Sequence, residues 1–445
     1  MNKIENANAA VACAAGALDA ATPDARRRTF IVAAATSVAT TAGALHFPMI
    51  ARAADRPVRI GYISPQTGPY ALFGETDKFT LRRIEALVQD GISIGGRKFA
   101  VEILMRDSQS NANKASEVAG NLILKDKVDI VMPSCTSETI NPVADQCELN
   151  AVPCLSTIQP WQSYFFSRGG APDKPFDWTY HFFWGLEDII ADYLSMWNSV
   201  KTNKKIGFLF ERSSDGEAWN NKDFGFPPAV TKAGYTYVTP PFFQPLSSDF
   251  SAQIAAFKDA GVEIVAGICL PPDLKAFIAQ SHQQGFKPKV VTVGKALLFP
   301  AAVEAMGDLG WGMSTEVWWT PAFPYKSSLT GETSAKLTAD YETASGRQWT
   351  QPLGYAHALW EVAVDVLKRC KDPHDHAAVR DAILATEMDT LIGPVRWKGG
   401  PVKNVAKTQV VGGQWVKGKK FKYELAIVDN ATANVVPAAA HLQLL

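Results

Sequence analysis

Strand-like and helix-like segments alternate along this chain from residue 57 onward, and this alternation restricts the possible folds more than any other feature. Short apolar runs predict strands at residues 58–63, 101–105, 130–132, 206–210, 264–270 and 290–293. Amphipathic stretches between them predict helices at residues 76–89, 113–125, 142–149, 189–199, 250–260, 274–284 and 354–369. Short buried strands separated by helices are typical of parallel sheets that helices cover on both faces.

The alternation occurs twice, once before residue 167 and again from residue 204, which favours two doubly wound α/β domains over one large domain. The chain length of 445 residues agrees, because single cores rarely grow beyond about 250–300 residues. Two aromatic-rich stretches and a strand-like region predict three crossover segments, at residues 165–184, 311–325 and 392–429. The expected boundaries are residues 54–184 and 316–394 for domain 1, and 185–315 and 395–445 for domain 2.

The N-terminal segment contains the three parts of an export signal. Arg26-Arg27-Arg28-Thr29-Phe30-Ile31 precedes an uncharged run to Leu45, and the small residues of Ala51-Arg52-Ala53 follow. This order describes a secretory signal, and the arginine pair resembles a twin-arginine signal. We therefore expect residues 1–53 to be cleaved and the mature protein to be soluble in the periplasm. A segment that carries arginines by chance is the alternative.

The composition argues against several classes of function. Lys and Arg together number 44, and Asp and Glu together also number 44. Because no basic cluster occurs after the N-terminal segment, nucleic-acid binding has no electrostatic support. No later stretch is long and apolar enough for a membrane-embedded protein. A nucleophile elbow, a phosphate-binding loop and a His-Glu-x-x-His helix are all missing from the sequence, so we expect no enzyme, no cofactor and no metal site.

Five cysteines follow the expected signal: Cys135, Cys147, Cys154, Cys269 and Cys370. An oxidising compartment permits disulfides, and the odd number leaves at least one thiol unpaired within the chain. Cys147 and Cys154 bracket a predicted helix end and strand start. A disulfide between them is one alternative, and two free thiols are the other.

Three loops in the first half follow predicted strands and carry side chains suited to ligand binding. Ligands of open α/β sheets bind beyond the carboxyl ends of the strands, where helix N-termini expose free N–H groups. Thr136 and Ser137 follow the predicted strand at residues 130–132 and cap the next helix, where hydroxyls and the helix dipole favour a carboxylate. The candidate ligand-binding residues of the three loops are Tyr70, Phe73, Thr136, Ser137, Gln159 and Trp161.

Each of these candidates also has a purely structural interpretation. Thr136 and Ser137 can act only as a helix cap, since this is the usual role of hydroxyls at a helix start. Tyr70 and Phe73 can pack beneath their own loop, and Trp161 can belong to the core rather than to a cleft wall.

Several short motifs follow one another along most of the chain after residue 57. They are Ile60-Gly61, Thr67-Gly68-Pro69-Tyr70 with Phe73-Gly74, Arg106-Asp107-Ser108-Gln109-Ser110-Asn111, Ala151-Val152-Pro153, Phe250-Ser251-Ala252-Gln253-Ile254, Ala279-Gln280-Ser281-His282-Gln283-Gln284-Gly285-Phe286 and Ile392-Gly393-Pro394-Val395-Arg396-Trp397. With these motifs the chain resembles the periplasmic solute-binding proteins of ABC importers, type I fold, leucine/isoleucine/valine-binding branch.

The resemblance implies two α/β lobes joined by three crossings, with a ligand cleft between them. It also implies a monomer that captures a small solute by hinge closure and delivers it to an inner-membrane ABC permease with its ATPase. A periplasmic sensor that feeds a signalling receptor is an alternative, because the same fold serves both uses.

The second half departs from the pattern of the amino-acid binders. Relatives that take leucine-like ligands carry a carboxylate after the strand at residues 290–293, where it meets the ligand ammonium. This chain has Lys295 there, so we expect a carboxylate-bearing ligand with an aromatic or apolar body. Asp215 and Leu270 complete the candidate set, and Asp215 leaves a true branched-chain amino acid binder as an alternative. Lys295 as a solvated surface residue is the structural alternative.

Overall fold

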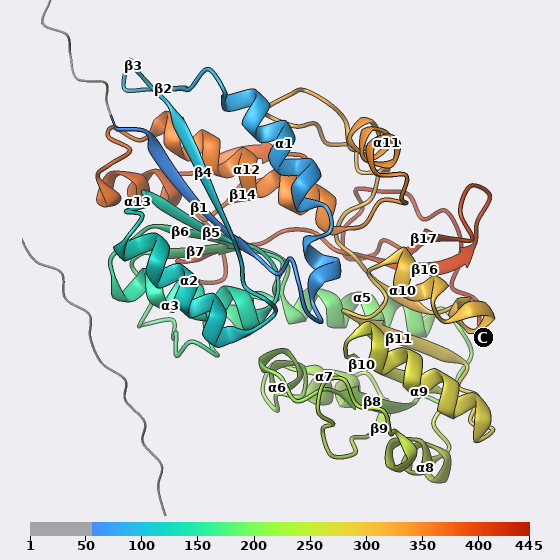
Figure 1. Cartoon of the computed structure of the whole chain (residues 1–445). Coiled ribbons are helices and arrows are strands. Elements are labelled where there is room, and N and C mark those ends of the chain that lie inside the picture. The colour runs from blue at the N-terminus through green and yellow to red at the C-terminus, as the bar shows by residue number, and fades with distance from the viewer. Residues whose placement is uncertain (1–55) are drawn as a thin grey trace, which may run out of the picture. The chain divides into compact units, whose positions relative to one another are not determined.

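Two separate β-sheets organise residues 56–445, which are the residues that the computed structural model describes (Figure 1). These residues belong to one compact unit. The expected export signal, with its arginine pair and its cleavage site after Ala53, lies outside the described residues. No helix among residues 56–445 is long and apolar enough to cross a bilayer.

The first sheet has six parallel strands in the order β15-β7-β6-β5-β1-β4. They are β15 (Val405–Ala406), β7 (Thr179–Phe182), β6 (Cys154–Thr157), β5 (Ile130–Pro133), β1 (Val58–Ser64) and β4 (Val101–Asp107). Neighbouring strand residues point to opposite faces, so Tyr62 and Ile63 of β1 belong to different hydrophobic clusters. The parallel order and the two buried faces are those that the alternating sequence predicts.

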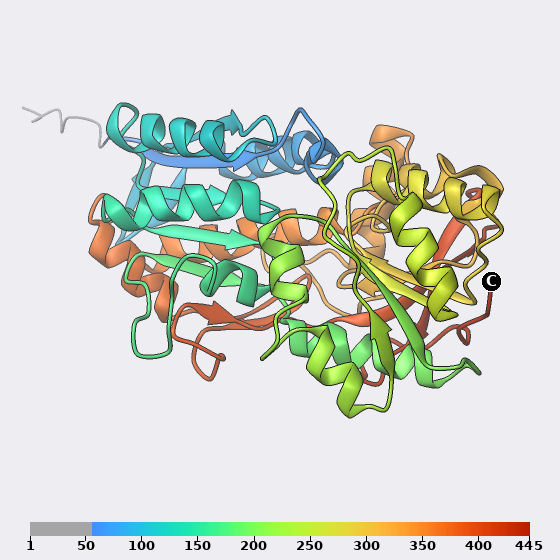
Figure 2. The same cartoon turned by 90° about the horizontal axis from the view of Figure 1, so that it is seen from below.

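Helices cover both faces of this sheet, with α2 and α3 on one side and α1 and α12 on the other (Figures 1 and 2). We call this sheet and its helices lobe 1. Its other elements are η1 (Ala71–Gly74), α1 (Asp77–Val88), β2 (Ile92–Ile94), β3 (Arg97–Phe99), α2 (Ala112–Leu124), α3 (Ser137–Leu149), α4 (Trp161–Phe165), α11 (Ser334–Ser345), α12 (Pro352–Arg369), α13 (His376–Leu384), β13 (Glu387–Thr390) and β14 (Gly393–Arg396).

The second sheet has seven strands in the order β17-β16-β12-β11-β10-β8-β9. They are β17 (Tyr423–Asp429), β16 (Val411–Lys417), β12 (Ser314–Val317), β11 (Val290–Gly294), β10 (Ile264–Ile268), β8 (Lys205–Phe210) and β9 (Thr236–Val238). The five strands from β9 to β12 are parallel, and β16 and β17 add an antiparallel edge. Such an edge is common on otherwise parallel sheets.

We call the second sheet and its helices lobe 2. The helices are α5 (Leu186–Asn198), α6 (Ser214–Trp219), α7 (Phe226–Lys232), α8 (Ser251–Ala260), α9 (Pro271–Gln283), α10 (Pro300–Glu304) and η2 (Gly307–Gly310). Phe257 of α8 and Phe277 of α9 pack with one face of the sheet, whereas Trp197 of α5 and Phe226 of α7 pack with the other. Both lobes are therefore doubly wound, as expected.

The chain passes between the lobes three times: after β7, after β12 and between β15 and β16. The third crossover is tied to the start of α5 and to α12. Lys407 Nζ lies 2.7 Å from Glu187 Oε1 and 2.8 Å from Asp188 Oδ1 at the start of α5. Tyr355 Oη of α12 donates to Thr408 Oγ1 at 2.7 Å. The domain boundaries remain predictions, although β15, which lies in the segment expected for domain 2, pairs with the first sheet.

All five cysteines of the described residues are free and buried. Cys147 and Cys154 are therefore two free thiols and do not form the disulfide that the sequence left open. His374, Asp375 and His376 do not form a metal-ligating cluster within residues 56–445. His376 Nδ1 lies 3.0 Å from the carbonyl oxygen of Ala151, and Asp375 caps α13.

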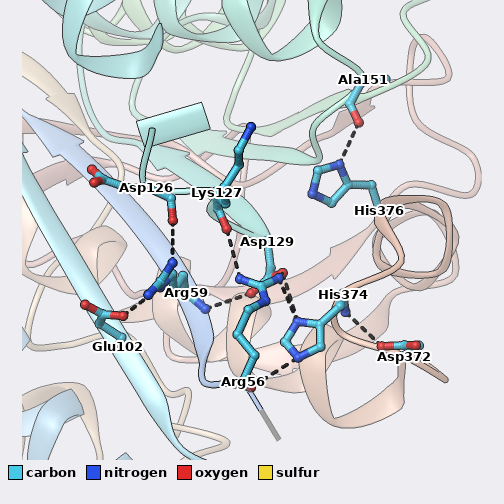
Figure 3. Close-up of polar contacts among 10 residues, drawn as sticks. All are labelled: Arg56, Arg59, Glu102, Asp126, Lys127, Asp129, Ala151, Asp372, His374 and His376. Carbon is cyan, nitrogen blue, oxygen red and sulfur yellow. Dashed lines mark hydrogen bonds and ion pairs between the residues drawn. The ribbon is translucent and has the colours of Figure 1, made fainter. Parts of the chain in front are cut away.

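A buried carboxylate anchors the start of β1 (Figure 3). Asp129 is fully buried, and its Oδ2 accepts a hydrogen bond from the backbone N–H of Arg59 at 2.8 Å. Its Oδ1 pairs with the Arg56 guanidinium and lies 3.0 Å from His374 Nδ1. One carboxylate therefore joins β1, the start of β5 and the loop before α13.

Asp129→Ala is expected to lower the free energy of unfolding by about 3 kcal/mol, because the partners lose a buried counter-ion and a backbone donor loses its acceptor. Urea denaturation measures the change. The matched control is Asp126→Ala, since Asp126 pairs with Arg106 at 2.8 Å but is one-third exposed, and it is expected to cost less than about 1 kcal/mol. Equal losses in the two variants would contradict this interpretation.

Candidate functional site

A cavity lies between the two lobes, at the carboxyl ends of the parallel strands, and contains about 370 Å³ of space not occupied by atoms. Its aromatic lining is Phe73, Phe183, Trp184, Trp219 and Trp318. Its polar lining is Thr136, Gln159, Asp215, Lys295 and Glu316. In lobe 1 these residues lie at or after the ends of β1, β5, β6 and β7, and in lobe 2 at or after the ends of β8, β11 and β12. Open α/β sheets bind ligands at these strand ends.

Two pairs of aromatic rings join the lobes directly. The rings of Phe73 in lobe 1 and Phe299 in lobe 2 meet edge to face with centroids 4.9 Å apart. Phe166 and Phe224 pack across the lobes at 5.2 Å. The structure therefore has the two lobes in contact around the cavity.

The candidate residues from the sequence divide into two groups. The residues that line the cavity are Phe73, Thr136, Gln159, Asp215 and Lys295, and those that lie outside its lining are Tyr70, Ser137, Trp161 and Leu270. Tyr70 is buried, with its ring centroid 5.3 Å from Lys295 Nζ, and Ser137 is the buried first residue of α3. Leu270 is the buried N-cap of α9.

Trp161 differs most from the expectation of a cleft wall. Its indole Nε1 donates to Glu187 Oε1 at 3.2 Å, and its backbone N–H donates to the carbonyl of Trp184 at 3.2 Å. Trp161 therefore connects α4 to the first crossover, because its position at the start of α4 turns the ring toward α5. It holds Trp184, which does line the cavity.

Five lining residues are not among those predicted from the sequence: Phe183, Trp184, Trp219, Glu316 and Trp318. Phe183, Trp184 and Trp318 belong to the aromatic-rich stretches that predict crossovers, and their aromatic content was the available signal. Glu316 gave no such signal, because a glutamate within a short strand has no motif around it.

Lys295 is a buried residue with two carboxylate partners, which excludes the solvated surface lysine. Its Nζ lies 2.8 Å from Glu211 Oε1 and 3.0 Å from Asp215 Oδ2, and its side chain is 5% exposed. Burial alone would lower the pKa of Lys295, but Glu211 and Asp215 outweigh it and raise that pKa. Burial raises the pKa of Glu211 despite the nearby Lys295 charge.

This pairing changes the expected role of Lys295. Two carboxylates already pair with Lys295, so it does not face the cavity as a free cation for a ligand carboxylate. The expectation of a direct Lys295–carboxylate contact depended on sequence position alone and does not take Glu211 into account. Glu211 follows β8, and it is buried below the cavity lining.

Glu316 is held within lobe 2 by neighbouring hydroxyls. Tyr193 Oη and Thr315 Oγ1 both donate to Glu316 Oε2 at 2.7 Å. Burial raises the pKa of Glu316. Because both hydroxyls are buried, they fix this carboxyl group at the cavity wall.

Left-handed backbone conformations concentrate at the cavity. Thr136, Ile158 and Lys295 line it with φ values of 62°, 69° and 64°, although none of them is glycine. Thr136 combines its φ with a ψ of 149°, a conformation that is close to glycine-only. Strained backbone of this kind clusters at binding sites, where it sets side-chain direction at a cost of about 1–3 kcal/mol per residue.

Thr136→Gly is expected to raise the free energy of unfolding of the ligand-free protein by about 1 kcal/mol, because glycine relieves the strain. Urea denaturation without ligand measures this. Thr343→Gly is the control, since Thr343 lies within α11 and glycine is expected to cost about 0.5 kcal/mol there. A loss of stability in Thr136→Gly would show that the loop is not strained.

Buried polar atoms around the cavity lack partners among residues 56–445. On the lobe 1 side and the first crossover these are Thr136 Oγ1, Ser137 Oγ, Glu138 Oε2, both amide atoms of Gln159 and Trp184 Nε1. On the lobe 2 side they are Glu211 Oε2, Asp215 Oδ1 and Trp219 Nε1. An unpaired buried polar group costs about 1–3 kcal/mol, so a bound molecule that pairs with these atoms is stabilised by them.

A sequence model with the description "Periplasmic binding protein" matches residues 57–420. The chain belongs to the periplasmic binding protein family. Members of this family are solute-binding proteins rather than enzymes. The family assignment agrees with the two-lobed fold and with a cavity at the strand ends of both lobes.

The chain is also similar to curated relatives and to solved structures. It is 26% identical over 223 residues to "Leu/Ile/Val-binding protein homolog 3" of Brucella melitensis biotype 1. The aligned segment covers 48% of this chain and 55% of the relative. The chain thus spans about half the length of this curated relative. Two crystal structures share the fold. The substrate-binding protein LivJ of Streptococcus pneumoniae in complex with isoleucine has a TM-score of 0.63 at 15% identity, covering 84% of this chain and 100% of that one. A solute-binding protein of an R. palustris ABC transporter in complex with 4-hydroxybenzoate has a TM-score of 0.67 at 18% identity, covering 84% and 96%.

Proposed function

We propose that this protein is the periplasmic substrate-binding component of an ABC importer and that its ligand is a small carboxylate with an aromatic body. The ligand binds between the lobes, hinge closure encloses it, and an inner-membrane permease with its ATPase receives it. The observation that carries this proposal is a closed interlobe cavity with aromatic walls and unpaired hydrogen-bond donors at a helix N-terminus.

The carboxylate end is assigned to lobe 1. Thr136 Oγ1 and Ser137 Oγ are unpaired at the start of α3, a helix of 13 residues whose first N–H groups have no partner within the helix. The positive end of the helix dipole and two hydroxyl donors favour an anion there. Glu138, the next residue of α3, also has an unpaired buried oxygen, Oε2, but its side chain does not line the cavity.

The aromatic body is assigned to the middle of the cavity. Phe73 and Trp184 approach from lobe 1 and its crossover, while Trp219 and Trp318 approach from lobe 2. Aromatic rings prefer offset and edge-to-face neighbours, which four such walls provide for a ring between them. The aromatic carboxylates and the isoleucine bound by structural neighbours are therefore the two ligand classes to compare.

Closure requires that the ligand contact both lobes, because a ligand shifts the open–closed equilibrium only through differential affinity. Thr136 and Gln159 belong to lobe 1, and Asp215 and Lys295 belong to lobe 2. A molecule that fills the cavity therefore stabilises the closed form, which supports hinge closure as the capture step.

Thermal unfolding with a ligand panel tests the proposal. Aromatic carboxylates at about 100-fold excess over Kd stabilise by about 2.7 kcal/mol, which shifts Tm by several degrees. Leucine and isoleucine, aromatic amides and urea serve as comparisons. Shifts produced by amino acids or amides, but not by aromatic carboxylates, would exclude the proposed ligand class.

A further inference from the structure

Helix α6 carries one unpaired hydrogen-bond acceptor and one unpaired donor on two residues that line the cavity. Asp215 and Trp219 are four residues apart on α6, so their side chains are neighbours on one helix face. Both line the cavity and are buried to 2% and 1% exposure. Asp215 Oδ1 and Trp219 Nε1 have no hydrogen-bond partner within the described part of the chain.

Both side chains are held in place by other contacts. Lys295 Nζ binds the second carboxylate oxygen of Asp215, Oδ2, at 3.0 Å, which leaves Oδ1 as the free acceptor. The Trp219 ring stacks on Phe226 with centroids 5.0 Å apart and an interplanar angle of 22°. The ring also packs against Gly294, where a Cβ atom would lie 2.7 Å from the Trp219 ring. The pair therefore forms a fixed acceptor–donor site.

We propose that this pair recognises a hydroxyl group of the ligand, which donates to Asp215 Oδ1 and accepts from Trp219 Nε1. The inference rests on the proposed function, since it adds a second polar group to the carboxylate bound by lobe 1. A hydroxyl is the small group that both donates and accepts, so it satisfies both atoms at once.

The donor Trp219 Nε1 favours this group over an ammonium. An ammonium on Asp215 Oδ1 would share one carboxylate with Lys295 Nζ. It would also leave Trp219 Nε1 without an acceptor. The role of Lys295 is then to hold Asp215 in place, rather than to bind the ligand.

Calorimetry of the full chain with matched ligands tests the inference. The probes are benzoate, the three hydroxybenzoate isomers, their methoxy counterparts and 4-(aminomethyl)benzoate. At least one hydroxybenzoate is expected to bind about 10- to 100-fold more tightly than benzoate, because a hydrogen bond to a charged group contributes on this scale. The matching methoxybenzoate, which accepts but does not donate, is expected to lose this gain.

Variants then locate the recognition on α6. In Asp215→Ala and in Trp219→Phe, the affinity ratio of that hydroxybenzoate to benzoate is expected to fall toward one. Glu217→Gln is the matched control, since Glu217 is exposed on the same helix, and the ratio is expected to stay at its wild-type value. If Asp215→Ala does not fold, the affinities of the wild-type protein for the ligand series and the affinity ratio in Trp219→Phe still test the inference.

Three results would overturn the inference. They are equal affinity for benzoate and every hydroxybenzoate, a hydroxyl gain that survives in both α6 variants, and tighter binding of 4-(aminomethyl)benzoate than of any hydroxybenzoate. Each of them leaves the proposed function intact, because benzoate still binds. If no aromatic carboxylate binds, the proposed function itself fails and the hydroxyl site fails with it.

Discussion

Lys295→Met is expected to lower the free energy of unfolding by about 3–5 kcal/mol, since removal of one partner leaves buried charges uncompensated. Glu211 is 0% exposed and the Asp215 side chain 3%, so water does not replace the lost cation. Urea denaturation of the ligand-free protein measures the loss. The expectation is specific because both partners lie within 3.0 Å of one Nζ atom.

Lys289→Met provides the matched control. Lys289 pairs with Glu263 at 2.8 Å, as Lys295 does with Glu211, but its side chain is 43% exposed. An exposed pair of this kind contributes about 0–1 kcal/mol. A similar small loss in Lys295→Met would show that the buried cluster does not depend on its lysine.

The pH dependence of the Lys295→Met variant has a definite sign. Burial raises the pKa of Glu211, and loss of the lysine charge removes a contribution that lowers this pKa. A group whose folded pKa is raised destabilises the fold above its unfolded pKa, and protonation removes that penalty. The gap between variant and wild type is therefore expected to narrow as the pH falls from about 8 toward about 5, near the ordinary range of glutamate. A gap that widens on acidification would contradict this.

The double variant Thr136→Ala with Ser137→Ala is expected to weaken binding of an aromatic carboxylate by about 100-fold or more. Each hydroxyl bonded to a carboxylate contributes about 1.5–3 kcal/mol, and neither hydroxyl has a hydrogen-bond partner among residues 56–445. Calorimetry with the carboxylate that shifts Tm most measures the effect.

Thr343→Ala with Ser345→Ala is the control for two lost hydroxyls. Both belong to α11, where they donate to backbone carbonyls at 2.7 Å, far from the cavity lining. Ligand affinity is expected to stay unchanged in this control. Wild-type affinity in the Thr136/Ser137 variant would remove the start of α3 from the binding site.

The helices were predicted well where the periodic pattern is continuous. The pattern at residues 354–369 corresponds to α12 (Pro352–Arg369), which is buried on nearly all sides. The predicted start at residue 142 was late, because Pro142 is a common first residue of helices. In the structure α3 begins at Ser137 and contains Pro142, whose nitrogen has no hydrogen to donate.

Part of the cavity lining was predicted from the sequence, and the direction of a side chain decided which candidate residues line the cavity. Residues that directly follow a strand, such as Thr136 and Asp215, were found because strand ends meet at one edge of a sheet. Trp161 also follows a strand, yet its ring turns to Glu187 in the first crossover. Its direction depends on a partner that the local sequence does not specify.

The sequence by itself determined the two doubly wound sheets, because the alternation of short apolar strands and amphipathic helices is a local pattern that each segment carries independently. Only the tertiary structure decided what Lys295 does. Its partner Glu211 is 84 residues away in the chain, and Asp215 lies on the helix that follows Glu211. The charge available to a ligand depends on which side chains become neighbours, and that is fixed when the strands of lobe 2 assemble into one sheet.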